Sequence, residues 1–155
     1  MSGSGIFARE LDPPGHVVQI GVANGRIISL SLPAEPEPGA DTDHTHLDWL
    51  QQYFAGEKTD VRAIETGLTV PTDQRRVLET IRKIPYGESL KLDRVIARAS
   101  GLDPEREADR AAAREAVESN PVPIVIPTHR VSDSEDPLPA DVRRTLRELE
   151  NSAKR

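Results

Sequence analysis

The stretch Asn120-Pro121-Val122-Pro123-Ile124-Val125-Ile126-Pro127-Thr128-His129-Arg130-Val131 decides how the rest of the sequence is interpreted. It sets three prolines around an apolar run and ends in three polar side chains. The chain contains no cysteine, and its single methionine is Met1. Cysteine is an effective nucleophile at neutral pH, whereas a hydroxyl such as that of Thr128 needs an adjacent base and reacts poorly with an alkyl carbon. We therefore expect a site that binds rather than reacts.

This stretch closely resembles the active-site segment of the O6-alkylguanine-DNA alkyltransferases, the methylated-DNA-protein-cysteine methyltransferases. Their pattern is NPVP, an apolar run and Pro-Cys-His-Arg-Val, and Thr128 stands at the cysteine position. Phe54-Ala55-Gly56 and residues 76–87 resemble two further family segments, YFAG and RKIPYGE. In the family, the cysteine accepts the alkyl group from the damaged base irreversibly. The resemblance therefore implies a lesion-handling protein without its reagent, and no catalytic residue is expected.

Three further positions match the family's hinge asparagine, general-base histidine and orienting glutamate, namely Asn120, His129 and Glu150. In the helix expected near the C-terminus, Glu150 lies four residues after Leu146 on the inner stripe, so its carboxylate should point inward. A buried carboxylate needs a partner, and His129 or Arg130 is available. A cysteine introduced by Thr128→Cys would then lie beside a base, and we expect its pKa to be lowered.

The net charge of −6 at first argues against a nucleic-acid partner, but its distribution does not. Residues 1–66 hold 4 basic and 10 acidic side chains, whereas residues 67–155 hold 16 of each. A neutral C-terminal half can still present a local basic face. Of the 20 basic residues 16 are arginine, which favours bidentate phosphate contacts; a GC-rich genome alone would produce the same bias, and both interpretations remain open.

Hydropathy predicts a cytoplasmic protein, and a monomer is expected. A chain of 155 residues suffices for one domain or two small ones. No apolar run approaches the length of a membrane span, and residues 1–5 lack the regions of a signal peptide, so no membrane partner is expected. The cluster of Asp and His over residues 41–48 is typical of helix caps and solvated charge, so neither a metal nor another cofactor is predicted.

The first part of the chain predicts an antiparallel sheet. Short strands are expected over residues 6–11, 16–23 and 27–32, with Asn24-Gly25 as a hairpin turn between the last two. A Pro-rich acidic loop over residues 33–44 precedes a helix expected over residues 45–55, which Gly56 ends. Trp49 and Tyr53 lie near the edge of the apolar stripe of this helix and are expected to pack in the core or an interface.

The second part predicts helices only, over residues 72–83, from Ser89 or Leu90 to about Ser100, from about Pro104 to Ser119, and over residues 140–151. The two central helices meet at Gly101, as in a helix-turn-helix whose later helix enters a DNA groove. With the resemblance, the fold class is α+β: an N-terminal ribonuclease-H-like antiparallel sheet domain (residues 1–66) and a C-terminal DNA-binding helical domain with a winged helix or helix-turn-helix (residues 67–155).

The helix expected from Pro104 to Ser119 carries an arginine stripe. Arg106, Arg110 and Arg114 are spaced by four, which places them on one face, and alanines keep the neighbouring surface small enough for close approach to DNA. The alternative is a solvated helix whose arginines pair with the acidic residues three and four positions away. Spacing alone does not separate these readings.

Further DNA-contact roles come from the resemblance. An arginine near the start of this helix fills the gap left when the alkylated base rotates out of the duplex, and Arg110 is the nearest match, with Arg114 second. A tyrosine in the preceding helix presses on the adjacent phosphate; Leu92 stands at its position. Arg130 completes the expected DNA-contacting set.

After Val131 the family has a glycine-rich loop that forms one wall of the alkylguanine pocket. Here the corresponding residues 132–139 are shorter, acidic and free of glycine. Negative charge beside a DNA groove is unfavourable.

The preferred hypothesis is a DNA-binding protein that recognises O6-alkylated guanine or distorted double-stranded DNA without alkyl transfer and marks the site for other repair proteins. Two alternatives stay open. One is a decayed family member that acts as a protein-interaction module without DNA binding. The other is a methyltransferase that uses Thr128, with His129 as its base and Glu150 orienting the histidine.

Overall fold

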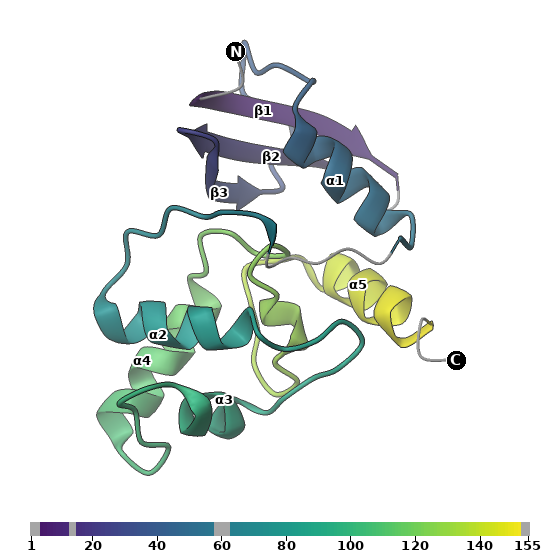
Figure 1. The fold of residues 1–155 in the computed structure, drawn as a ribbon. Coiled ribbons are helices and arrows are strands. Elements are labelled where there is room, and N and C mark those ends of the chain that lie inside the picture. The colour runs from purple at the N-terminus through teal and green to yellow at the C-terminus, as the bar shows by residue number, and fades with distance from the viewer. Residues whose placement is uncertain (1–3, 13–14, 58–62, 153–155) are drawn as a thin grey trace.

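A computed structural model describes residues 4–12, 15–57 and 63–152 (Figure 1). Its sheet has three antiparallel strands in the order β1-β2-β3, with bounds Ser4–Leu11, His16–Ala23 and Arg26–Ser31. The hairpin between β2 and β3 turns at Asn24 (φ 52°) and Gly25 (φ 78°), left-handed values that Asn and Gly adopt most readily. The predicted turn is therefore confirmed, and β1 begins two residues earlier than the sequence pattern predicts.

One face of the sheet is buried because apolar residues alternate along β1 and β2, while a bulge in the β2–β3 pairing brings Ile27 and Leu30 of β3 to the same face. The inward side chains are Phe7, Leu11, Val18, Ile20, Val22, Ile27 and Leu30. Helix α1 (Thr45–Phe54) covers the sheet in Figure 1 and buries Leu47, Leu50, Tyr53 and Phe54. Before this helix, the Pro-rich loop over residues 33–44 pairs with the free edge of β1, where Ala8 N–H donates to Asp41 O at 2.9 Å.

The helical part consists of α2 (Thr72–Ile81), α3 (Leu92–Arg98), α4 (Glu107–Glu118) and α5 (Ala140–Ser152). A short 3₁₀ turn, Thr128–Arg130, lies between α4 and α5. Helices α2, α3 and α4 pack together below the sheet, whereas α5 lies next to α1 (Figure 1). None of the helices in the described ranges is long and apolar enough to cross a membrane.

Two helix starts differ from the prediction. Helix α3 begins at Leu92 rather than at residue 89 or 90, because Leu90 pairs in an extended conformation with the 3₁₀ turn: Leu90 N–H donates to Arg130 O at 2.9 Å. Helix α4 begins at Glu107 rather than near Pro104. There the Asp109 carboxylate accepts the Asp103 N–H at 2.9 Å, which stabilises a turn before the helix. Arg106 is consequently the N-cap residue and lies outside the regular helix.

The hydrophobic core is continuous from the sheet to the helices. A single cluster of buried residues joins the sheet and α1 to α2, α4 and α5. Polar contacts also cross the expected boundary at residue 66, for example Leu30 N–H donating to Pro121 O at 2.9 Å. The two parts of the chain therefore share one core.

Candidate functional site

The segment after α4 is a tight buried loop held by one amide side chain. Asn120 Nδ2 donates to Ile126 O at 2.9 Å and to Thr128 Oγ1 at 3.1 Å, while Asn120 Oδ1 accepts the Val122 N–H at 2.9 Å. Every residue from Val122 to Val131 is buried. Ile124 adopts φ 77°, a strained conformation for a β-branched residue, and the surrounding contacts hold it there. Asn120 thus fixes the position of Thr128.

Thr128 is fully buried, and its hydroxyl is engaged. Thr128 Oγ1 donates to Asp136 Oδ2 at 2.9 Å and accepts from Asn120. No hydrogen bond joins this hydroxyl to His129 in the described part of the chain. Asp136 comes from the acidic loop after Val131, which the sequence predicted only as negative charge beside a groove.

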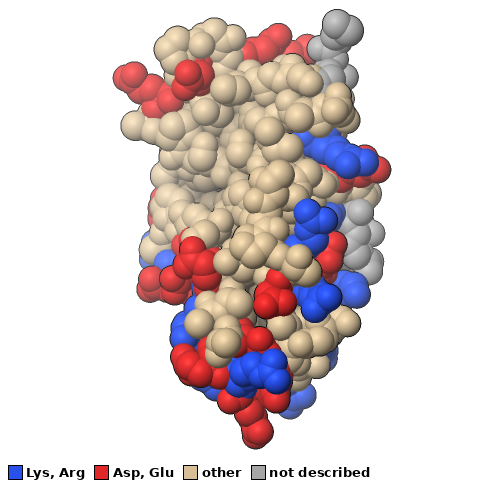
Figure 2. Space-filling view, turned by 90° about the vertical axis from the view of Figure 1, so that its left-hand side faces the viewer, with Lys and Arg blue, Asp and Glu red and all other residues tan. Residues whose placement is uncertain are grey.

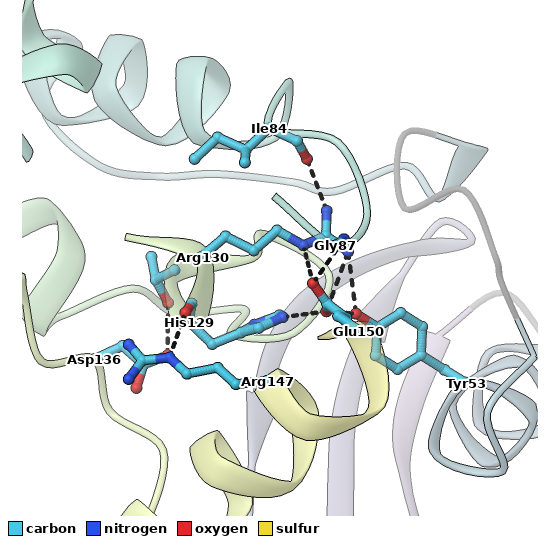
Figure 3. Close-up of polar contacts among 9 residues, drawn as sticks. Tyr53, Ile84, Gly87, His129, Arg130, Asp136, Arg147 and Glu150 are labelled. Atoms are coloured by element: carbon cyan, nitrogen blue, oxygen red, sulfur yellow. Dashed lines mark hydrogen bonds and ion pairs between the residues drawn. The ribbon is translucent and has the colours of Figure 1, made fainter. Parts of the chain in front are cut away.

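Four residues from three segments converge on the carboxylate of Glu150 (Figure 3). His129 Nε2 lies 2.6 Å from Glu150 Oε2, and Arg130 Nε donates to Glu150 Oε1 at 2.8 Å. The hydroxyl of Tyr53, from α1, donates to the same carboxylate, and so does the Gly87 N–H at 3.3 Å. The prediction that Glu150 points inward and finds a partner is confirmed, and it finds four.

The pKa values in this cluster depend on burial and on the two side chains next to Glu150, His129 and Arg130. Burial alone would raise the pKa of Glu150, but the hydrogen bonds and charges of His129 and Arg130 outweigh it and lower the pKa to about 2. Burial, followed by the charge of Glu150, raises the pKa of Tyr53. Glu150 is therefore ionised, and Tyr53 is a neutral donor throughout the physiological range.

Arg130 was expected among the DNA-contacting residues, and the structure contradicts a surface role for it. Its side chain is 3% exposed. Its guanidinium donates to Glu150, to Ile84 O at 2.8 Å and to Tyr53 Oη at 3.1 Å, so its donors are directed inside the molecule. Such a buried ion pair cannot be opened toward a phosphate without leaving Glu150 uncompensated.

Tyr53 is a site residue that sequence reasoning missed. The helical pattern of α1 placed it near the edge of the apolar stripe and indicated packing. Its buried position matches that interpretation, but its hydroxyl pairs with Glu150, which lies 97 positions later in the chain. A buried tyrosine needs a partner for its hydroxyl, and this rule was the one signal available in the sequence.

His129 keeps one ring nitrogen without a partner. Its Nδ1 is buried and makes no hydrogen bond to any described residue. Nε2 faces the Glu150 carboxylate and therefore carries a proton. His129 lines a small hollow together with Ser89, Arg147 and Asn151.

All three predicted arginines lie at the surface, and each has an acidic neighbour. Arg114 pairs with Glu107 at 3.0 Å, Arg110 with Asp93 of α3 at 3.6 Å and Arg106 with Asp109 at 3.9 Å. Between 42% and 66% of their side chains is exposed. Exposed pairs of this kind contribute about 0 to 1 kcal/mol, so a phosphate competes with them readily.

A shallow groove runs between α3, α4 and the acidic loop over residues 132–139. It is lined by Leu92, Asp93, Arg110, Arg114, Glu118, Asp133, Ser134 and Glu135. Leu92, at the position of the family's tyrosine, is 9% exposed, and its N–H donates to Asp133 Oδ1 at 2.8 Å. Carboxylates thus outnumber arginines in this groove.

Helix α3 exposes a second basic stripe that the sequence reading did not single out. Lys91, Arg94 and Arg98 follow one another at i, i+3 and i+7, and all three are exposed. Within the described ranges none of them has a carboxylate within 4.0 Å. The spacing is present in the sequence, but the predicted helix start at residue 89 or 90 places Lys91 inside the helix rather than at its N-cap.

Charge on one flank of the molecule is mixed. Figure 2 shows basic and acidic side chains interspersed over the lower, helical part, whereas the centre of the upper, sheet part is largely uncharged. The view contains no continuous basic patch.

The cluster of Asp and His residues over positions 41–48 caps a helix. The side chain of His44 caps α1 by accepting the His46 N–H at 3.0 Å. Among the described residues, no group of three or more His, Asp or Glu is arranged to hold a metal.

Comparison with known proteins places this geometry in context. A family model described as 6-O-methylguanine DNA methyltransferase, DNA binding domain, matches residues 72–150. The methylated-DNA-protein-cysteine methyltransferase of Archaeoglobus fulgidus is 37% identical over 92 residues, which cover 59% of this chain and 57% of that protein. Its counterpart in Mycobacterium bovis is 31% identical over 122 residues, covering 76% and 69%. The chain thus spans little more than half the length of some curated relatives that it matches.

Solved structures agree with the sequence matches. The O6-methylguanine methyltransferase of Mycobacterium tuberculosis superposes with a TM-score of 0.73 and 27% identity, covering 96% of this chain and 94% of that one. A structure of OGT from the same organism in complex with DNA gives 0.72 and 25%, covering 95% and 92%. These likenesses confirm the predicted α+β fold.

Proposed function

Because this chain belongs to the methylated-DNA-protein-cysteine methyltransferase family, a family of DNA-binding repair proteins, we propose that it binds alkylated or distorted double-stranded DNA without removing the alkyl group. The observation that carries the proposal is the absence of cysteine from a chain that contains the family's DNA-binding segment. Binding without repair leaves the lesion in place. Such a protein marks the site for other repair proteins.

The surroundings of Thr128 support the absence of transfer. Its hydroxyl is buried and donates to Asp136, so its lone pairs do not face an open site. His129, the base that a hydroxyl nucleophile would need, faces Glu150 through Nε2. Even beside the Asp136 carboxylate, a hydroxyl is a far weaker nucleophile toward an alkyl carbon than a thiolate.

We assign the DNA-contacting surface to α3 and α4, within the proposed C-terminal domain of residues 67–155. In a helix-turn-helix, the first helix crosses the phosphate backbone and the second enters the groove. The stripe formed by Lys91, the N-cap residue of α3, with Arg94 and Arg98 has no carboxylate within 4.0 Å among the described residues, which suits the first task. Arg110 and Arg114 on α4 suit the second, since their present ion pairs are weak.

The rival function is a protein-interaction module without DNA binding. It is favoured by the groove between α3, α4 and the acidic loop, where Asp93, Glu118, Asp133 and Glu135 face two arginines. Carboxylates at that place oppose a phosphate backbone.

Titration of fluorescent duplexes, with and without O6-methylguanine, separates the two functions. We expect both duplexes to bind, with an affinity that falls steeply as salt rises because phosphate contacts release counterions. Absence of binding to either duplex at low salt, with the protein folded, would establish the rival.

A further inference from the structure

The acidic loop over residues 132–139 turns one of its carboxylates into the molecule. The Asp136 side chain is fully buried. It accepts the Thr128 hydroxyl proton at 2.9 Å and the Leu138 N–H at 3.3 Å, and Arg143 Nε lies 3.6 Å away. A buried carboxylate is costly unless such partners compensate it. Asp136 therefore holds the loop against Thr128.

The start of the loop is anchored as well. Ser132 N–H donates to Leu90 O at 2.9 Å, and Asp133 Oδ1 accepts the Leu92 N–H at 2.8 Å. Between these anchors and Asp136, the outer residues line two surface grooves, one against α3 and α4 and the other against α5. The loop thus lies between the two surface grooves and Thr128.

From this geometry we propose that Asp136 is a specificity-determining residue that closes the Thr128 site to ligands. A ligand reaches Thr128 from these grooves only if the Asp136 carboxylate leaves its present place. A base extruded from DNA therefore finds the site closed, and the protein reads DNA from outside this loop. The consequence for DNA rests on the proposed function, but the closure itself does not.

The same contact reverses an expectation drawn from the sequence. A cysteine introduced by Thr128→Cys was expected to have a lowered pKa because His129 would stand beside it. In the structure the nearest charged group is the carboxylate of Asp136, and a negative neighbour disfavours a thiolate. The thiol should therefore have a raised pKa and be shielded.

Because the chain has no cysteine, one introduced thiol is an unambiguous reporter. Thr128→Cys is compared with Ser31→Cys, an exposed position at the end of β3. The rate of reaction with iodoacetamide is measured against pH, without DNA. We expect Thr128→Cys to react at least about tenfold more slowly at pH 8, with an apparent pKa above the ordinary value of about 8.5.

The charge is then removed with the shape conserved. Adding Asp136→Asn to Thr128→Cys should lower the apparent thiol pKa and raise the rate at pH 8 about tenfold. The matched control is Asp133→Asn, which removes a charge from the same loop, keeps the acceptor for Leu92 and does not touch Thr128; it should leave the profile unchanged. Equal reactivity of Thr128→Cys and Ser31→Cys, or equal effects of both asparagine substitutions, would overturn the proposal.

A second reporter covers the case in which Thr128→Cys does not fold. Leu138→Cys places a thiol in the same loop at a position that is 4% exposed. A closed loop protects this thiol, and Asp136→Ala should expose it; a thiol that reacts as fast as Ser31→Cys with Asp136 present would show an open loop and overturn the closure.

DNA titrations test what the closure does. The unchanged protein should respond to distortion of the duplex and not to the alkyl group itself. It should therefore bind a duplex with O6-methylguanine and an equally distorted mismatched duplex without the alkyl group within about twofold of each other, and Asp136→Ala should separate the two affinities. A marked preference for the lesion that Asp136→Ala does not alter would overturn the specificity role. If the unchanged protein binds neither duplex, the proposed function is contradicted. The thiol measurements alone then test whether Asp136 closes the Thr128 site.

Discussion

Glu150 is the residue on which most buried polar groups of the site depend. It compensates Arg130, orients His129 and accepts the Tyr53 hydroxyl. All of these side chains are nearly or fully buried, so loss of the carboxylate leaves a cation and two donors without their partner. Removing one member of a buried pair typically costs about 3 to 5 kcal/mol.

The first prediction concerns Glu150→Gln and the dependence of stability on pH. The pKa of Glu150 is about 2 in the folded protein, below its ordinary value near 4.5, so its stabilisation is complete above that ordinary value and is lost as pH falls toward 2. This difference corresponds to roughly 3 kcal/mol. Glu150→Gln should therefore be less stable at pH 7, and its free energy of unfolding should decline less than that of the unchanged protein between pH 5 and 2.

Urea unfolding at a series of pH values measures this effect. Glu148→Gln is the control, because Glu148 is exposed on the same helix and its change should leave the curve nearly intact. If the free energy of unfolding falls equally in Glu150→Gln and in the unchanged protein between pH 5 and 2, the lowered pKa of Glu150 does not stabilise the fold.

At the scale of elements, α3 and α4 differ in how their basic side chains are engaged. The arginines of α4 each have a carboxylate nearby, whereas Lys91, Arg94 and Arg98 on α3 have none within 4.0 Å among the described residues. A cation without such a partner breaks no ion pair when it moves to a phosphate. The shorter helix therefore offers the better electrostatic contact.

The second prediction compares two sets of substitutions. Changing Lys91, Arg94 and Arg98 together to Ala should weaken duplex binding and reduce the slope of log affinity against log salt by about 2 to 3, roughly one for each lost phosphate contact. Changing Arg110 and Arg114 to Ala should reduce the slope by less than about 2, because their acidic partners are released at the same time.

The control removes three exposed charges elsewhere, with Arg26, Lys83 and Arg144 changed to Ala. Its net charge equals that of the α3 variant, so a purely global charge effect would lower both slopes equally. Fluorescence anisotropy from about 50 to 200 mM salt gives all the slopes. A slope that is unchanged in the α3 variant would place the DNA contact on another surface.

At the scale of the whole molecule, the chain has two parts and one core. Glu150 of α5 binds Tyr53 of α1, and His16 of β2 lies 2.9 Å from Asp141 of α5. Helix α5 thus belongs to the helical part in sequence and packs beside the sheet part in space (Figure 1). The proposed DNA-contacting surface lies in residues 67–155, but the core that supports it is formed by residues from both parts of the chain.

The third prediction follows from this shared core. A fragment of residues 67–155 should lack cooperative thermal unfolding, because it exposes the apolar side chains that face the sheet and leaves Glu150 without Tyr53. Adding a separate fragment of residues 1–66 should restore part of the transition. Circular dichroism during heating measures both outcomes, and a sharp transition in the isolated fragment would show an independent domain.

The fourth prediction concerns the complete protein and its reaction. Incubation with a duplex that contains O6-methylguanine should leave the protein mass unchanged and the lesion intact, because no thiol is present and the Thr128 hydroxyl is buried against Asp136. Mass spectrometry of protein and DNA decides this. A gain of one methyl group mapped to Thr128 would establish a methyltransferase with a threonine nucleophile.

The sequence by itself determined the features that depend on neighbouring residues. The turn at Asn24 and Gly25 follows from their tolerance of left-handed backbone angles, and the inward direction of Glu150 follows from its spacing of four from Leu146. The segment from Asn120 to Val131 also identified the family, because its residues are contiguous. None of these features requires knowledge of a distant partner.

Only the tertiary structure decided which charged groups are buried and where two helices begin. Arg130 was expected to contact DNA, Tyr53 was expected only to pack, and no buried role was predicted for Asp136. Each of them is buried and paired with partners from other elements. Likewise α3 starts late because Leu90 pairs with the 3₁₀ turn instead of extending the helix. Burial of a charge or loss of a helical turn depends on contacts between segments far apart in the chain, and local periodicity carries no record of those contacts.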